Sequence, residues 1–175
     1  MHIKKSYLIF LITLLNIGSC LGQQKTNIIS CEEYGNITFN GITIDQINAT
    51  EGTHQKVKQL LGTYTSVEED KGSRSRSFMY GNNRIGFNYE FGYVSRITIK
   101  DAQWPVKIKG HAIRVGDSEA DLKQAFGSDL IVTETPYFSN NIVSFNCQGN
   151  NADGLHIHVN PETDKVVKIK YWVNP

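Results

Sequence analysis

The chain has 175 residues, of which 39% are hydrophobic and 20% charged, so it is ordinary globular material for one compact domain or two small ones. Its formal net charge is +1, and the charge becomes −1 if the N-terminal segment that contains Lys4 and Lys5 is removed. A charge this close to zero excludes any argument from net charge for binding nucleic acid or a strongly charged membrane surface.

Residues 1–22 are predicted to be an export signal. Lys4 and Lys5 precede an apolar run over residues 7–15, and the small residues Gly18 and Ser19 follow it. This is the three-part layout of a signal peptide. The run is too short for a permanent membrane helix, which needs roughly 20 residues.

The sequence offers two cleavage sites for this signal. Residues 17–20 resemble a bacterial lipobox, which implies a lipid on Cys20 at the mature N-terminus. The alternative is ordinary cleavage after Gly22, because Cys20 and Gly22 are both small. We expect the lipidated form, and therefore an outer-membrane or periplasmic lipoprotein rather than a freely secreted protein.

Two cysteines remain after the signal, Cys31 and Cys147. An even number of cysteines in an oxidising compartment predicts a disulfide, here between the N-terminal segment and a strand of the second half. The alternative is two buried thiols, because spacing alone does not establish geometry. Residues 23–34 are otherwise polar and are predicted to be a linker without a fold of its own.

The rest of the chain is predicted to contain one pattern twice, as repeat 1 over residues 35–103 and repeat 2 over residues 104–175. Gly127 aligns with Gly62 at the end of a similar amphipathic stretch in each half. The aligned segments are 118–127 with 53–62, 154–159 with 86–91, and 166–169 with 94–97.

Each repeat is expected to begin with a β-hairpin. Residues 37–44 alternate apolar and polar side chains around Asn40-Gly41, and Asn-Gly is the strongest short-range hairpin signal. Residues 106–113 place Lys109-Gly110 at the equivalent position.

One short helix is expected after each hairpin. Thr53 and Ser118 stand where an N-cap hydroxyl would be, and Asp121 completes an approximate capping box with Ser118. Gly62 and Gly127 are expected to end the helices in the left-handed conformation. Helices this short are not stable alone and must pack on a sheet.

Three strands are expected after each helix, near residues 75–80, 84–91 and 94–100 in repeat 1, and near 142–147, 154–160 and 165–173 in repeat 2. The fold class is therefore α+β, with two tandem ββ-α-βββ repeats and one short helix per repeat packed on one face of an antiparallel sheet. The side chains expected on the helix-covered face are Phe87, Tyr89, Phe91, Ile97, Ile99, Leu155, Ile157, Val159, Val167, Ile169 and Tyr171.

The order of helix, closing glycine and meander resembles the repeating unit of the SmpA/OmlA outer-membrane lipoproteins. Used twice in tandem, it is similar to the secreted β-lactamase inhibitory proteins. Residues 53–62 and 118–127 carry the resemblance best, although the proline often found after the closing glycine is missing here. The resemblance implies that the open sheet face binds protein and that the chain does not catalyse. Exported bacterial families without an assigned activity share this layout, and we expect the chain to belong to one of them.

The sheet face that the helices leave open is predicted to be basic and to bind an envelope or extracellular protein. Trp172 among lysines is the arrangement of an interface anchor with an acidic partner. The alternative is a solvated face that binds nothing. The residues expected to take part are Arg96, Lys100, His156, His158, Lys168, Lys170 and Trp172, and the same face is expected to show Asn88, Glu90, Thr98, Ser144 and Asn146.

Two chemical functions compete with binding. Residues 116–118 and 153–156 resemble the nucleophile and base blocks of GDS-type esterases, but their spacing is too short for that fold, and Ser118 is expected to be a helix cap. His156 and His158 share a strand face and would offer two ligands to zinc or copper, but a third, from Asp153 or His111, would need a tertiary contact.

We therefore expect no catalytic residue, no metal and no cofactor. The expected function is an exported, non-enzymatic protein-binding module at the cell envelope; the alternative is a small secreted hydrolase or a metal-binding protein.

Overall fold

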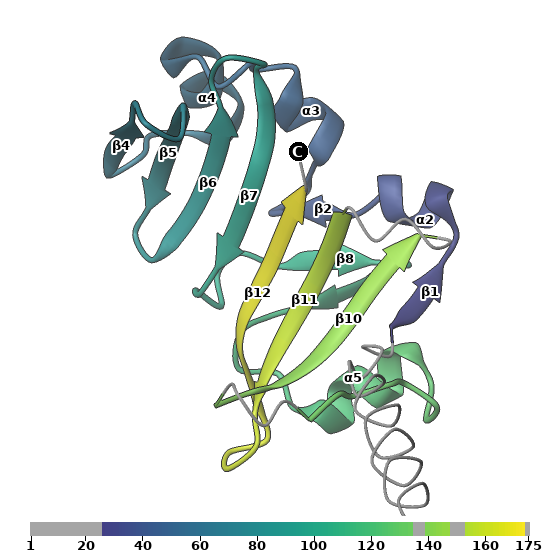
Figure 1. The fold of residues 1–175 in the computed structure, drawn as a ribbon. Coiled ribbons are helices and arrows are strands. Elements are labelled where there is room, and N and C mark those ends of the chain that lie inside the picture. Colours follow the sequence, from purple (N-terminus) through teal and green to yellow (C-terminus); the bar gives the residue numbers. More distant parts are fainter. Residues whose placement is uncertain (1–25, 135–138, 148–152, 174–175) are drawn as a thin grey trace, which may run out of the picture.

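The computed structural model describes residues 26–134, 139–147 and 153–173 as an α+β fold with two mostly antiparallel sheets (Figure 1). The predicted export signal, including Cys20, lies outside the described residues. Within the described residues the large sheet has eight strands, and each strand is antiparallel to its neighbours except that β1 is parallel to β10. In spatial order its strands are β1 (Asn27–Ile29), β10 (Asn141–Cys147), β11 (Asp153–Asn160), β12 (Lys165–Val173), β7 (Tyr93–Ile99), β6 (Asn83–Asn88), β5 (Ser75–Tyr80) and β4 (Ser66–Asp70).

The small sheet is built from the two predicted hairpins. Asn40 and Gly41 have positive φ angles of 52° and 83°, and Lys109 and Gly110 have 49° and 86°. Two consecutive residues with positive φ make the turn that suits a two-residue hairpin, so both hairpin predictions are confirmed. Its strands, in spatial order, are β3 (Ile42–Thr43), β2 (Thr38–Phe39), β8 (Val106–Ile108) and β9 (His111–Ile113).

The helices include the two that were predicted, α4 (His54–Leu61) and α5 (Glu119–Phe126). The hydroxyl of Ser118 accepts a hydrogen bond from the amide of Asp121, and the Asp121 carboxylate accepts from the amide of Ser118. Thr53 was expected to cap α4 in the same way, but its hydroxyl makes no cap bond and instead donates to the carbonyl of Thr50 at 3.1 Å.

The structure adds two helices that the single-helix pattern did not include, α2 (Cys31–Gly35) and α3 (Ile44–Asn48). Each begins with a capping box, Ser30 with Glu33 in α2 and Thr43 with Gln46 in α3. These side chains satisfy amide groups that the backbone leaves unpaired at a helix start. The expectation of one helix per half is therefore wrong for the first half.

One hydrophobic core joins the two sheets and the helices. The small sheet lies behind β11 and β12 in Figure 1, and the ring of Phe39 on β2 is 5.8 Å from that of Tyr171 on β12. Val57 of α4 and Leu122 of α5 belong to the same cluster of buried side chains. The helices and the small sheet thus cover one face of the large sheet, and its other face is the open face.

Residues 23–34 were predicted to be a linker, but their described part is folded. β1 pairs with β10, and the side chain of Asn27 donates to the carbonyl oxygens of Ile131 and Ser144, both at 3.0 Å. Cys31 and Cys147 form the predicted disulfide, with their Cα atoms 4.8 Å apart. The segment is ordered because these contacts tie it to the edge of the large sheet.

The predicted alternation of buried and exposed side chains fails at two irregular places. β6 ends at Asn88, so Phe91 lies in the following turn and is 68% exposed, and Tyr89 is only partly buried. In β12 an irregularity in the pairing with β11, between His158 and Val159, leaves Val167 exposed, and Val166 takes the buried position. Both errors came from extending strict two-residue periodicity through a turn or a bulge.

Candidate functional site

The open face of the large sheet brings together most of the residues predicted to bind a partner. Trp172 lies directly opposite Arg96 of β7, and His156 lies opposite Lys170. His158 lies opposite Lys168. We call the four cations Arg84, Arg96, Lys168 and Lys170 the basic cluster; they lie on β6, β7 and β12.

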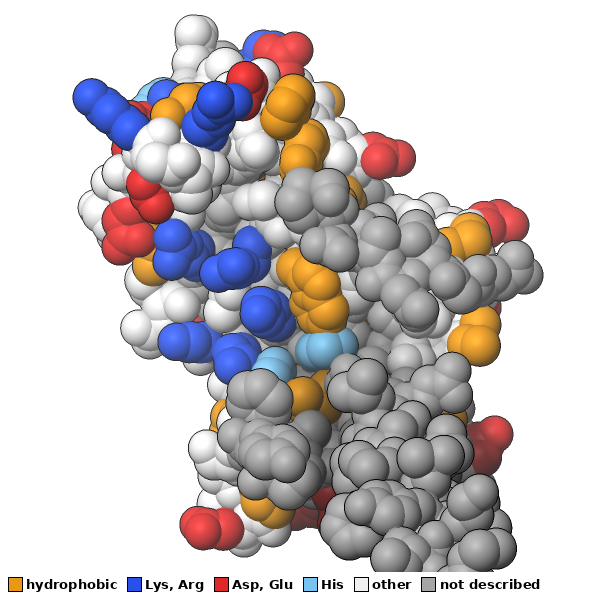
Figure 2. Space-filling model, in the orientation of Figure 1, with side chains coloured by type: hydrophobic (Ala, Val, Ile, Leu, Met, Phe, Trp, Pro, Cys, Tyr) orange, Lys and Arg blue, Asp and Glu red, His pale blue; other side chains and the backbone are white. Residues whose placement is uncertain are grey.

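The basic cluster carries little compensating negative charge. Figure 2 shows lysine and arginine side chains gathered over the centre of this face, next to histidine and hydrophobic side chains, with acidic side chains at the margin over β4 and β5. Arg84 pairs with Glu68 at 3.4 Å. Arg96, Lys168 and Lys170 have no ion-pair partner among the described residues. An anionic group placed here would meet three cations to which the described part of the chain offers no counter-charge.

Burial, and after it the crowding of positive charge, shifts the pKa values of three groups on this face. Burial lowers the pKa of Lys170, and the charges of Arg96 and Lys168 lower it further. The pKa of His156 falls to about 4, first through burial and then through His158 and Lys170. The pKa of His158 also falls to about 4, through burial and the two lysines. Both histidines are therefore neutral at pH 7, and the positive charge of the face comes from lysine and arginine.

Trp172 is held in place by its neighbours on the sheet. Its ring lies over Gly154 of β11, where a β-carbon would be 2.5 Å from the ring atom Cζ2. The ring of His156 meets it edge-on with centroids 4.0 Å apart, and the ammonium of Lys170 lies 5.5 Å from the centroid of the tryptophan ring. Contacts of this kind fix the orientation of a partly exposed aromatic ring, so little side-chain entropy remains to be lost on binding.

The predicted and observed faces differ at several positions. Lys100 is exposed one residue beyond the end of β7, and its backbone amide donates to Asn83. Ser144 and Asn146 were expected on the open surface, but they are only 3% and 9% exposed. Arg84 was missed, although its alternation with Ile85 would have placed it on this face.

The structure does not bring together the residues of the two chemical alternatives. Ser118 caps α5 on the core side of the large sheet, whereas His156 is on the open face. The rings of His156 and His158 are 6.2 Å apart, but His111 lies beside Phe126, which is also on the core side. No group of three metal-ligating side chains occurs among the described residues, which do not include the side chain of Asp153.

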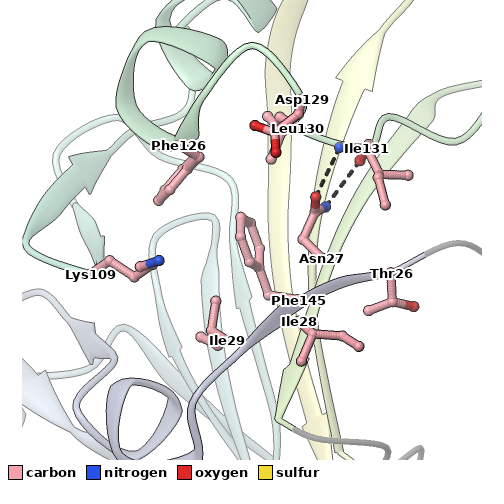
Figure 3. Close-up of a pocket in the computed structure, with 10 residues that line it drawn as sticks. All are labelled: Thr26, Asn27, Ile28, Ile29, Lys109, Phe126, Asp129, Leu130, Ile131 and Phe145. Atoms are coloured by element: carbon pink, nitrogen blue, oxygen red, sulfur yellow. Dashed lines mark hydrogen bonds between the residues drawn. The ribbon is translucent and has the colours of Figure 1, made fainter.

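A second candidate site is a cavity of about 390 Å³ between β1, β10 and the end of α5 (Figure 3). Lys109 is the single cation among its described lining residues, and its ammonium is already 3.6 Å from Glu33. The cavity therefore offers less to a charged ligand than the basic cluster does. Its lining is Thr26, Asn27, Ile28, Ile29, Lys109, Phe126, Asp129, Leu130, Ile131 and Phe145.

No family model matches the chain, and no curated protein matches it by sequence. Among solved structures, it is similar to an extracellular protein containing an SCP domain from Bacillus anthracis, with a TM-score of 0.47 and 10% identity. That match covers 90% of this chain and 49% of the other, so the chain spans about half the length of that protein.

A second similar structure is a DUF4309 family protein from Bacillus subtilis, with a TM-score of 0.37 and 13% identity over 74% of this chain and 95% of the other. Both similar structures are bacterial, and neither is described as a β-lactamase inhibitory protein or an SmpA/OmlA lipoprotein. Among the described residues, no helix is both long enough and apolar enough to cross a membrane.

Proposed function

We propose that this protein is an exported, non-enzymatic binding module whose open face binds an acidic surface of an envelope or extracellular protein. The observation that carries the proposal is the group of three cations, Arg96, Lys168 and Lys170, that have no ion-pair partner among the described residues and lie around a tryptophan whose ring is already fixed. Tryptophan and arginine are the residues most often found at the energetic centre of protein interfaces, and complementary charge speeds and orients association.

We also propose that the fold is a tandem duplication. The strand order supports this, because the large sheet runs β10-β11-β12 and then β7-β6-β5, so that the last strand of each half meets at the centre. The small sheet repeats the arrangement, with the first hairpin strands β2 and β8 paired at its centre. Such an order is expected when two similar units are related by an approximate two-fold axis.

The protein is proposed to act outside the cytoplasm, attached to a membrane by a lipid on Cys20. The Cys31–Cys147 disulfide supports an oxidising compartment. Membrane partition of the wild type and a Cys20→Ala variant tests the lipid: the wild type should sediment with membranes and the variant should not. A wild type found in the soluble fraction would contradict the lipidation.

The binding proposal is tested by affinity capture from an envelope extract, followed by comparison of charge-reversal variants. Arg96→Glu with Lys170→Glu should remove the captured partner while the thermal melt stays close to that of the wild type. Lys58→Glu with Lys107→Glu is the matched control, because both lysines are exposed, lie outside the open face and change the net charge equally. Equal loss of capture in both double variants would show a non-specific charge effect and would refute the proposed site.

A further inference from the structure

The turn that follows β6 presents an exposed aromatic pair beside the open face. Among the described residues, three large hydrophobic side chains are exposed, and Phe91 is the most exposed of them at 68%. Its ring stacks on that of Tyr93, with centroids 6.0 Å apart and planes 13° from parallel. We call these two residues the aromatic pair.

The exposure of Phe91 does not result from a loose turn. The side-chain oxygen of Asn88 accepts from the amides of Glu90 and Phe91, at 3.0 and 3.3 Å, and its carbonyl accepts from Gly92 at 2.8 Å. The carboxylate of Glu90 forms an ion pair with Arg74. These bonds determine the path of the turn, so Phe91 is exposed to solvent from an ordered turn.

The next strand fixes the other half of the aromatic pair and places it on the open face. The backbone amide of Val94 donates to the Asn48 side chain at 2.7 Å, and Val94 is buried on the core side of the sheet. Tyr93, the preceding residue, pairs with Asn88 and points to the opposite side, which is the face of Arg96 and Trp172. The aromatic pair therefore continues the binding face along β7.

We propose that the aromatic pair is a second anchor of this face, and that the partner contributes an acidic polypeptide segment carrying one bulky apolar side chain. The apolar side chain packs on Phe91, and the carboxylates of the same segment reach Arg96 and the rest of the basic cluster. This proposal rests on the proposed function. A preformed, exposed aromatic surface binds an apolar group without first having to be ordered, and the adjacent uncompensated cations select for acidic neighbours.

The geometry also sets the spacing within the partner segment. Tyr93 and Arg96 pair with Asn88 and Gly86, which are only two positions apart on β6 because the pairing shifts between Gly86 and Phe87, and this corresponds to roughly 7 Å along a strand. In an extended peptide, side chains two positions apart point to the same side, so the apolar residue and the first acidic residue should be about two positions apart. A polypeptide fits this pattern because its side chains repeat at a regular spacing.

The test uses the full-length protein and three synthetic peptides. The first has a leucine followed two positions later by the first of three acidic residues, the second replaces the leucine by serine, and the third replaces the acidic residues by their amides. The first peptide should bind about tenfold more tightly than the second, since burial of one large apolar group contributes on that order. Binding of the first and second peptides should require Arg96, and the third should bind more weakly than either.

Phe91→Ser should lower the affinity for the first peptide to that for the second and leave the second unchanged. Ile28→Ser is the matched control, because Ile28 is 67% exposed on β1 at the edge of the same sheet and should have no effect. If the first two peptides bind equally, or if Phe91→Ser leaves the first unaffected, the second anchor is refuted, although Arg96-dependent binding would still support the proposed function.

Other occupants of the aromatic pair would give different results. Self-association of the wild type that Phe91→Ser abolishes would show that a second copy covers the aromatic pair, and this would overturn the peptide proposal. Phe91-dependent binding of heparin without binding of any peptide would point to an anionic polysaccharide and would also overturn it. Failure of all three peptides to bind the wild type would refute this inference, whereas the proposed function would be refuted by the capture experiment with the charge-reversal variants.

Discussion

At the scale of single residues, the binding role that we propose for the open face depends on unfavourable local electrostatics. Burial lowers the pKa of Lys170, and the neighbouring charges of Arg96 and Lys168 lower it further. An acidic partner would relieve this repulsion, whereas the free protein carries it as a cost in stability. Residues at binding sites often show such a conflict between stability and function.

The two histidines predict a specific loss of stability in acid. Their pKa is about 4 in the folded protein and 6.5 without the fold, so the unfolded chain binds more protons between these values. The free energy of unfolding should therefore fall as the pH drops from about 6.5 to about 4. Urea denaturation at several pH values should show a shallower fall for His156→Gln with His158→Gln. Parallel curves for wild type and variant would contradict the lowered pKa values.

A substitution at Gly154 tests whether the Trp172 ring is held against the sheet. A β-carbon at this position would be 2.5 and 2.6 Å from two ring atoms, so Gly154→Ala must push the indole away from the sheet. We expect a loss of about 1 to 3 kcal/mol in the free energy of unfolding, typical of overpacking, and a changed near-ultraviolet circular dichroism spectrum. Gly35→Ala is the control, since nothing lies within 4 Å of a β-carbon there. Identical spectra for Gly154→Ala and the wild type would show that the ring is not held against the sheet.

At the scale of secondary-structure elements, the two predicted helices differ in how they begin. Ser118 makes a full capping box at the start of α5, whereas Thr53 makes no cap bond at the start of α4. Ser118→Ala should lower the free energy of unfolding by about 1 kcal/mol. Thr53→Ala should change it by less than about 0.5 kcal/mol, as expected for a surface position. Equal effects in urea denaturation would contradict this difference.

We expect the stable pairing of β1 with the large sheet to depend on the Cys31–Cys147 disulfide. Cys31 and Cys147 are 116 positions apart, and the chain-entropy model gives about 4 to 5 kcal/mol for a loop of this size, as an upper value. Cys31→Ser with Cys147→Ser should lower the melting temperature and increase amide hydrogen exchange in residues 27–29. The strands β5 to β7 should keep their protection. An unchanged melting temperature would show that β1 stays paired without the covalent link.

The sequence predicted elements best where local signals and tertiary contacts agree. The strands β5 and β12 have the expected bounds, and α4 and α5 begin directly after Thr53 and Ser118. β4 was missed because Ser66–Asp70 has no apolar alternation and forms only by pairing with β5. The capping boxes of α2 and α3 were visible in the sequence, but their helices are too short for a periodic apolar stripe to appear.

The composition of the open face was predicted only in part, because alternation shows which side of a strand a residue occupies but not which residue lies beside it on the next strand. It placed Arg96 and Trp172 on one face, but only the pairing of β7 with β12 puts them opposite each other. That pairing joins distant parts of the chain and has no local signal. Alternation also could not predict the exposure of Phe91, because that exposure depends on where β6 ends.

At the scale of the whole molecule, the two halves share one core and one large sheet. Buried residues from both halves belong to a single cluster, and β12 pairs with β7 across the centre of the sheet. We therefore expect one cooperative unfolding transition in calorimetry, with equal calorimetric and van't Hoff enthalpies. Two separate transitions would mean that each half folds independently.

The pairing of β7 with β12 comprises four residue pairs, and one of them is Arg96 with Trp172. Neither half of the chain forms the proposed contact surface alone, because the Arg96 cation comes from the first half and the Trp172 indole comes from the second. Weakening this short pairing should abolish the proposed binding without altering any side chain of the proposed contact surface. Mutations of the buried isoleucines in this pairing would then reduce the proposed binding, although these side chains lie on the opposite side of the sheet from the proposed contact surface.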